Sequence, residues 1–98
     1  MAAGEVYLVI NPDPTKQAVH IDKAKYDLMR AAILDNLQEH GPMTFNQLRA
    51  LIEEQLQDLF DGSVMLYFTA VKLDLEARGE IRRVLKSNLK LIELNIAV

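Results

Sequence analysis

The order of helix starts, glycine stops and a closing turn between Thr44 and Leu94 constrains this chain more than any other feature. Residues 44–47 read Thr-Phe-Asn-Gln and fit a capping box. In that motif the threonine hydroxyl accepts from an N–H group of the first helical turn, and the glutamine side chain accepts from the threonine N–H. Apolar residues then recur every three or four positions as far as Leu59. We therefore expect a helix over residues 45–58.

A further helix and a hairpin follow in the same stretch. Apolar periodicity and Gly79 predict a helix over residues 64–78, because glycine tolerates the left-handed conformation that ends many helices. Two short apolar segments, 81–86 and 89–94, flank Ser87-Asn88, which we interpret as a two-residue turn. This stretch is thus predicted to form two helices closed by an antiparallel β-hairpin.

The first part of the chain predicts short strands and another helix. Residues 5–10 are nearly apolar on both faces and are predicted to be a strand, and residues 18–21 a second short strand. The prolines within 11–14 indicate a turn or loop between them. Asp22 is a favourable N-cap, and the apolar stripe after it predicts a helix over residues 23–40.

Length and composition indicate a single domain that spans residues 1–98. Half of the residues are hydrophobic and 26% are charged, so the chain can bury a core and disorder is not expected. We divide the domain into an N-terminal strand region (5–21), a helical core (22–79) and a hairpin region (80–94). No run of 18 apolar residues is present, and the start lacks the features of a signal peptide. We expect a cytoplasmic protein that does not enter a membrane.

The helix expected over residues 64–78 has two apolar faces when its residues are placed at 100° intervals. The first face is assigned to the core and consists of Val64, Phe68, Val71 and Leu75. The second face is nearly opposite and consists of Leu66, Ala70, Leu73 and Ala77. A helix with two apolar faces is usually covered on both. We expect the second face to meet the N-terminal strands of the same chain or another copy of the protein, and we favour a two-fold homodimer.

The turn at Ser87-Asn88 also predicts which hairpin residues share a face. A two-residue loop pairs Ile81 with Leu94 and Leu85 with Lys90. One face then collects apolar residues that we expect to close the core, namely Ile81, Leu85, Ile92 and Leu94. The other face presents Arg82 opposite Glu93, with Lys86 near the turn.

Positive charge gathers on the hairpin. Residues 77–98 carry five basic and two acidic residues, whereas residues 44–76 carry two basic and six acidic ones. An anionic partner would therefore be attracted to one end of the molecule. The candidate phosphate-binding residues are Arg82, Arg83, Lys86 and Lys90. Alternatively, these charges protect an exposed hairpin edge from aggregation. Lys72 and Thr69 are the candidates for reaching base edges, although Glu76 on the same polar strip would repel phosphate.

Two motifs resemble winged helix-turn-helix proteins. Thr44-Phe45-x-x-Leu48 resembles the start of their second helix, and Leu75-Glu76-Ala77-Arg78-Gly79-Glu80-Ile81 resembles the passage from their third helix into the hairpin. The resemblance covers about residues 22–94. It implies an α+β fold with a three-helix winged helix-turn-helix core, a C-terminal β-hairpin wing and an N-terminal strand or hairpin.

The chain differs from winged helix-turn-helix regulators on the exposed face of the third helix. Where winged-helix regulators usually carry Arg, Lys, Ser, Asn or Gln on the exposed face of the third helix, this chain has Leu66, Ala70, Leu73 and Ala77. Residues 9–14 and 19–34 are in addition similar to a group of short uncharacterised bacterial proteins, which implies no activity.

Two functions from different classes follow from these observations. The first is a DNA-binding transcriptional regulator whose basic wing contacts the phosphates of double-stranded DNA. The second is a protein-interaction or dimerisation module that does not bind DNA. The chain has no cysteine, its two histidines lie on different predicted elements, and no catalytic motif is present. We therefore expect no enzyme, metal site, cofactor or small-molecule substrate.

Overall fold

Three helices and two antiparallel hairpins make up the computed structural model, which describes residues 6–10, 19–59 and 64–95. The elements are β1 (Val6–Val9), β2 (Val19–Asp22), α1 (Lys23–His40), α2 (Phe45–Leu56), α3 (Val64–Ala77), β3 (Ile81–Lys86) and β4 (Leu89–Leu94). The predicted α+β class and the predicted order of elements are confirmed, with small shifts at the ends. The turn expected at 11–14 lies outside the described residues.

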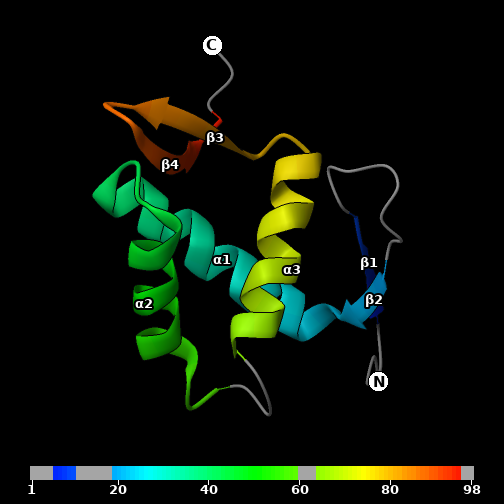
Figure 1. Ribbon diagram of the computed structural model, residues 1–98. Coiled ribbons are helices and arrows are strands. Elements are labelled where there is room, and N and C mark those ends of the chain that lie inside the picture. Colours follow the sequence, from blue (N-terminus) through cyan, green and yellow to red (C-terminus); the bar gives the residue numbers. More distant parts are fainter. Residues whose placement is uncertain (1–5, 11–18, 60–63, 96–98) are drawn as a thin grey trace.

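The elements are arranged around α1. This helix crosses behind α2 and α3, the β3–β4 hairpin closes one end of the helices, and β1–β2 lies beside α3 on the side away from α2 (Figure 1). Strands β1 and β2 pair antiparallel, with Val6 opposite Asp22, and form a sheet separate from β3–β4. Helix α3 therefore contacts a strand of each hairpin, β1 and β3.

The core lies where the three helices and the base of the β3–β4 hairpin meet. Its largest fully buried apolar side chains come from all three helices and include Met29, Ile33, Leu48, Ile52 and Phe68. Burial of each such side chain stabilises the fold by about 1.5–3 kcal/mol. The predicted core face of α3 is confirmed, because its four apolar residues are all buried.

Both helix starts follow the predicted capping chemistry. The Asp22 carboxylate accepts from the Lys25 N–H at 3.2 Å. At α2 the Thr44 hydroxyl accepts from the Gln47 N–H, and the Gln47 side chain accepts from the Thr44 N–H, each at 3.1 Å. These contacts satisfy N–H groups that have no partner within the helix. The capping box expected at the start of α2 is confirmed.

The register of β3–β4 is the predicted one, with Ile81 opposite Leu94 and Leu85 opposite Lys90. Ser87 and Asn88 have φ values of 51° and 66°, as a two-residue turn with left-handed central residues requires.

One prediction for this hairpin is wrong. Leu85 was expected in the core, but it is 67% exposed. The strands are exposed toward the turn, so only the base of the hairpin, with Ile81 and Ile92, is buried in the core.

Two contacts fix the hairpin base to the helical part. Met43, in the connection between α1 and α2, forms a bridge with Ile92: its N–H donates to the Ile92 carbonyl at 3.0 Å, and the Ile92 N–H donates back at 2.7 Å. On the α1 side, Arg30 donates to the Glu80 carboxylate, and this hydrogen bond raises the pKa of the guanidinium. The Met43 bridge was not predicted, because a single paired residue leaves no periodic pattern in the sequence.

Candidate functional site

The outward face of α3 is apolar. Leu66 is 69% exposed, and the other residues predicted for this face, Ala70, Leu73 and Ala77, are partly exposed. Thr69 is partly exposed as well and lies one turn from Leu73 on the helix. This face thus offers apolar side chains and one hydroxyl to a partner.

Lys72 does not lie on this outward face. The sequence placed it on an exposed polar strip, but only 7% of the residue is exposed. Its Nζ pairs with the Glu76 carboxylate and lies 5.6 Å from the centroid of the Phe45 ring. A carboxylate and an aromatic face together offset the cost of burying an ammonium group. In this position Lys72 joins α3 to the start of α2, and its charge is covered.

Glu76 connects the same pair to the β3–β4 hairpin. Its side chain is 6% exposed, and its Oε1 lies 3.0 Å from Nε of Arg83 on β3. The Arg83 side chain is 67% exposed, so the guanidinium covers the carboxylate from the solvent side. The Glu76 carboxylate therefore lies between two cations, Lys72 and Arg83.

A second charged cluster lies on the opposite flank of α3. Asp74 is fully buried and accepts hydrogen bonds from Tyr26 Oη at 2.5 Å and from the Ile10 N–H at 2.8 Å. Arg78 Nε donates to both Asp74 oxygens at 2.9 and 3.0 Å, and Arg78 Nη2 donates to the Leu8 carbonyl at 2.9 Å. The cluster fastens β1 and α1 to α3. It was not predicted, because Asp74 and its partners on β1 and α1 lie far apart in the sequence.

The exposed face of the β3–β4 hairpin carries basic residues that are paired with an acid. Arg82 Nε donates to Glu93 Oε2 at 2.7 Å, and Lys86 Nζ lies 3.6 Å from Glu93 Oε1. The hydrogen bond from Arg82 is the main cause that lowers the pKa of Glu93. Arg82 and Lys86 still expose more than half of their side chains. Lys90 is exposed and forms no ion pair with any residue in the described part of the chain.

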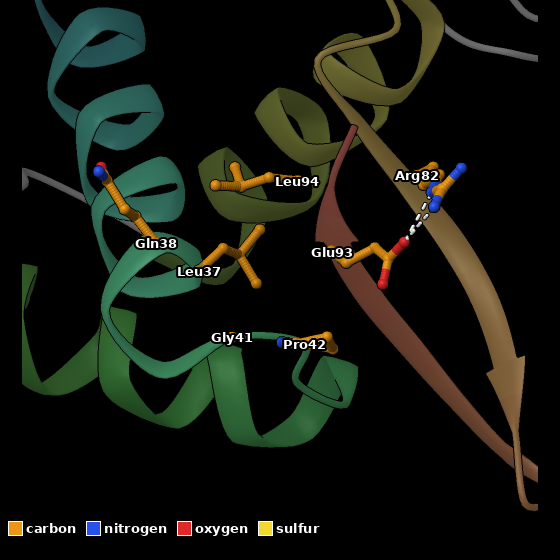
Figure 2. A pocket seen from close by; sticks show the side chains of 7 residues that line it. All are labelled: Leu37, Gln38, Gly41, Pro42, Arg82, Glu93 and Leu94. Carbon is orange, nitrogen blue, oxygen red and sulfur yellow. Dashed lines mark hydrogen bonds and ion pairs between the residues drawn. The ribbon is translucent and has the colours of Figure 1, made fainter. Parts of the chain in front are cut away.

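A pocket of about 400 Å³ lies between the end of α1 and this hairpin (Figure 2). Its lining residues are Leu37, Gln38, Gly41, Pro42, Arg82, Glu93 and Leu94. The charged groups on the hairpin wall already bind each other, as the dashed lines between Arg82 and Glu93 show. The pocket therefore offers no unpaired charge to a ligand.

A smaller hollow of about 240 Å³ adjoins the outward face of α3. It is lined by Ile21 of β2 and by Leu66, Tyr67 and Ala70 of α3. The Lys25 ammonium lies 5.2 Å from the centroid of the Tyr67 ring. Because its walls are almost wholly apolar, this hollow suits an apolar side chain.

Within the described ranges, no group of three or more His, Asp or Glu side chains is placed to hold a metal ion. In the same ranges, no helix has the length and apolar character needed to cross a membrane.

Comparison with known proteins identifies a family. A protein-family model described as a family of unknown function matches residues 7–91, from within β1 to within β4. No curated protein and no solved structure matches the chain.

Proposed function

This chain belongs to the family of unknown function DUF6958, and we propose that it is a winged-helix-like protein-interaction module that does not read DNA bases. The observation that carries the proposal is the chemistry of α3. The cation of α3, Lys72, is buried against Glu76, and Arg78, directly after the helix, binds Asp74.

Base reading in a major groove needs donors and acceptors that reach the base edges. The outward face of α3 supplies Leu66, Leu73 and two alanines, with Thr69 as the polar exception. Thr69 and Lys72 were both candidates for base contact, and the burial of Lys72 leaves a single hydroxyl. Exposed apolar surface is instead typical of protein interfaces, where its burial drives association.

DNA binding through the hairpin is the second candidate. The observation in its favour is that Arg82, Lys86 and Lys90 point charge toward solvent at one end of the molecule. Phosphate contacts need no base recognition, so a hairpin could bind a duplex without help from α3. Glu93 weakens this candidate, because its carboxylate neutralises part of the charge of Arg82 and Lys86.

Fluorescence anisotropy with random duplex DNA across a salt series separates the two candidates. We expect no salt-dependent binding by the wild-type protein, even near about 50 mM salt. Binding with a clear salt slope would overturn the proposal in favour of the hairpin. In that case Lys86→Ala combined with Lys90→Ala should reduce the slope of log K against log salt by about 1.8, while the matched variant Lys23→Ala on α1 should not change it.

A further inference from the structure

The outward face of α3 has the spacing of a helix–helix interface. Leu66, Ala70, Leu73 and Ala77 are separated by four, three and four positions, the repeat by which helices interlock at a small crossing angle. Leucine and alanine alternate along this seam, so its surface rises and falls once every two turns. We call these four residues the α3 seam.

The alternation makes the seam complementary to itself in one orientation. When a second α3 runs antiparallel about a two-fold axis centred between Ala70 and Leu73, Leu66 lies opposite Ala77 and Ala70 lies opposite Leu73. Every leucine then faces an alanine of the other copy. A parallel pairing would instead place leucine against leucine and alanine against alanine. We propose that the partner of the α3 seam is a second copy of this chain, bound antiparallel.

The apolar hollow beside the seam supports the same pairing. It is lined by Ile21, Leu66, Tyr67 and Ala70, and Ala70 is the residue that Leu73 of the second copy meets. Leu73 of each copy can therefore enter the hollow of the other, as a knob fits a hole in packed helices. A hollow of about 240 Å³ is large enough to receive a leucine side chain.

The charged residues near the α3 seam do not repel a second copy that binds there. The charged residues on and directly after α3 that lie nearest the seam are Lys72, Asp74, Glu76 and Arg78, and each has an oppositely charged partner within its own chain. Lys25, at the edge of the hollow, lies over the Tyr67 ring. Burying exposed apolar surface against apolar surface is favourable, whereas burying an unpaired charge is costly. The seam of a second copy brings neither a like charge nor an unpaired donor.

The size of the seam sets the expected affinity. Two helices of 14 residues form an interface at the small end of the range for specific complexes, near or below about 1,200 Å². We therefore expect a dissociation constant on the order of micromolar. The inference rests on the proposed function, since it names the partner for the same face of α3.

Cysteine cross-linking tests the orientation without background, because the natural chain has no cysteine. Leu66→Cys protein mixed with Ala77→Cys protein should form a disulfide-linked dimer under mild oxidation. Leu66→Cys protein alone should not, because the two copies of position 66 lie about 16 Å apart along the antiparallel helices, beyond the reach of a disulfide. Efficient cross-linking of Leu66→Cys protein with itself would overturn the antiparallel arrangement.

A size exchange tests the complementarity by sedimentation over about 1 to 300 µM protein. Ala70→Leu alone places two leucines opposite each other, and Leu73→Ala alone leaves alanine opposite alanine. Each should weaken the dimer at least about tenfold, and the double variant should recover most of the loss because a leucine again faces an alanine. Leu85→Ala is the control: it makes the same change as Leu73→Ala at an exposed leucine away from the seam and should leave the dimer unchanged.

The outcomes separate this inference from the proposed function. A wild-type protein that remains monomeric at the highest concentration overturns the second copy as partner. If that protein also fails to bind duplex DNA, the interaction module stands and its partner is a different protein. If the monomer binds DNA with a salt slope, both proposals fail.

Discussion

Asp74 and Glu76 lie two positions apart on α3, and each fastens a different β-hairpin to the helix. Asp74 is fully buried and is held by two neutral donors, from Tyr26 and Ile10, together with one guanidinium. Glu76 is held by two cations, one of them buried and one largely exposed. The N-terminal cluster is thus nearly neutral, whereas the cluster under the β3–β4 hairpin carries excess positive charge.

The contrast shows how differently two buried acids can be satisfied. The partners of Asp74 are Ile10 directly after β1, Tyr26 on α1 and Arg78 directly after α3. The loss of the carboxylate would therefore leave donors from three separate segments without their acceptor. Glu76 has cations in excess, so the loss of one still leaves the other. We therefore expect removal of a charged group from the Asp74 cluster to lower the free energy of unfolding more than removal of one cation beside Glu76.

The largest expected effect comes from Asp74→Asn. The change keeps the size of the side chain but removes the charge that Arg78, Tyr26 and the Ile10 N–H all address. We expect the free energy of unfolding to fall by about 3 kcal/mol in urea denaturation. Asp27→Asn is the control, since Asp27 forms an exposed ion pair on α1 worth less than about 1 kcal/mol. If both variants lower the free energy of unfolding by the same amount, the buried Asp74 contributes no more to stability than the exposed Asp27.

Lys72→Met should have a smaller effect. It removes the buried ammonium but leaves Arg83 beside Glu76, so the carboxylate keeps one cation. We expect a loss of about 2 kcal/mol by the same measurement. Lys25→Met serves as the control, because that lysine lies over an aromatic ring with no buried carboxylate and should lose less than about 1 kcal/mol. A loss as large as that of Asp74→Asn would show that Arg83 does not compensate.

Arg83→Ala should be milder still. Its side chain is 67% exposed, and an ion pair open to water contributes about 0.2–1 kcal/mol. The effect should shrink as salt is raised, because salt screens exposed charges more than buried ones. Denaturation at low and high salt measures this dependence. If Arg83→Ala destabilises the protein more than Lys72→Met, the exposed cation is the main partner of Glu76.

The smallest effect concerns Glu93, a carboxylate of the exposed hairpin face. The hydrogen bond from Arg82 lowers the pKa of Glu93 below its ordinary value of 4.5. The stability that this pair contributes is therefore complete above pH 4.5 and is lost as the pH falls through the lower, folded pKa. Glu93→Gln should flatten that part of the stability profile below pH 4.5. Arg82→Ala should add no further pH dependence in the Glu93→Gln background, and any added dependence would point to another acid.

Local rules predicted the elements that depend on neighbours in the sequence. The capping box at Thr44 and the turn at Ser87-Asn88 each involve residues within a few positions of one another. The turn fixed the hairpin register, because two left-handed residues allow one pairing of the flanking strands.

Features that depend on distant contacts were missed. Leu85 alternates correctly with Ile81, but alternation does not tell how far the helices extend under the strands. Lys72 lies between two apolar faces of α3, and only packing against Phe45 and Glu76 shows that it is covered. The Asp74 cluster joins residues that lie far apart in the sequence, and no local sequence pattern predicts that their donors surround one carboxylate.

The bridge between Met43 and Ile92 has a consequence for changes in chain length. The connection between α1 and α2 is short, and its backbone pairs with β4 immediately before the N-cap Thr44. One inserted residue here would displace either the pairing with Ile92 or the start of α2. An insertion between Ser87 and Asn88 would change the turn itself, but both residues are exposed and lie away from the core. Loop grafts and peptide tags therefore belong at the tip of the β3–β4 hairpin, not in the connection at Met43.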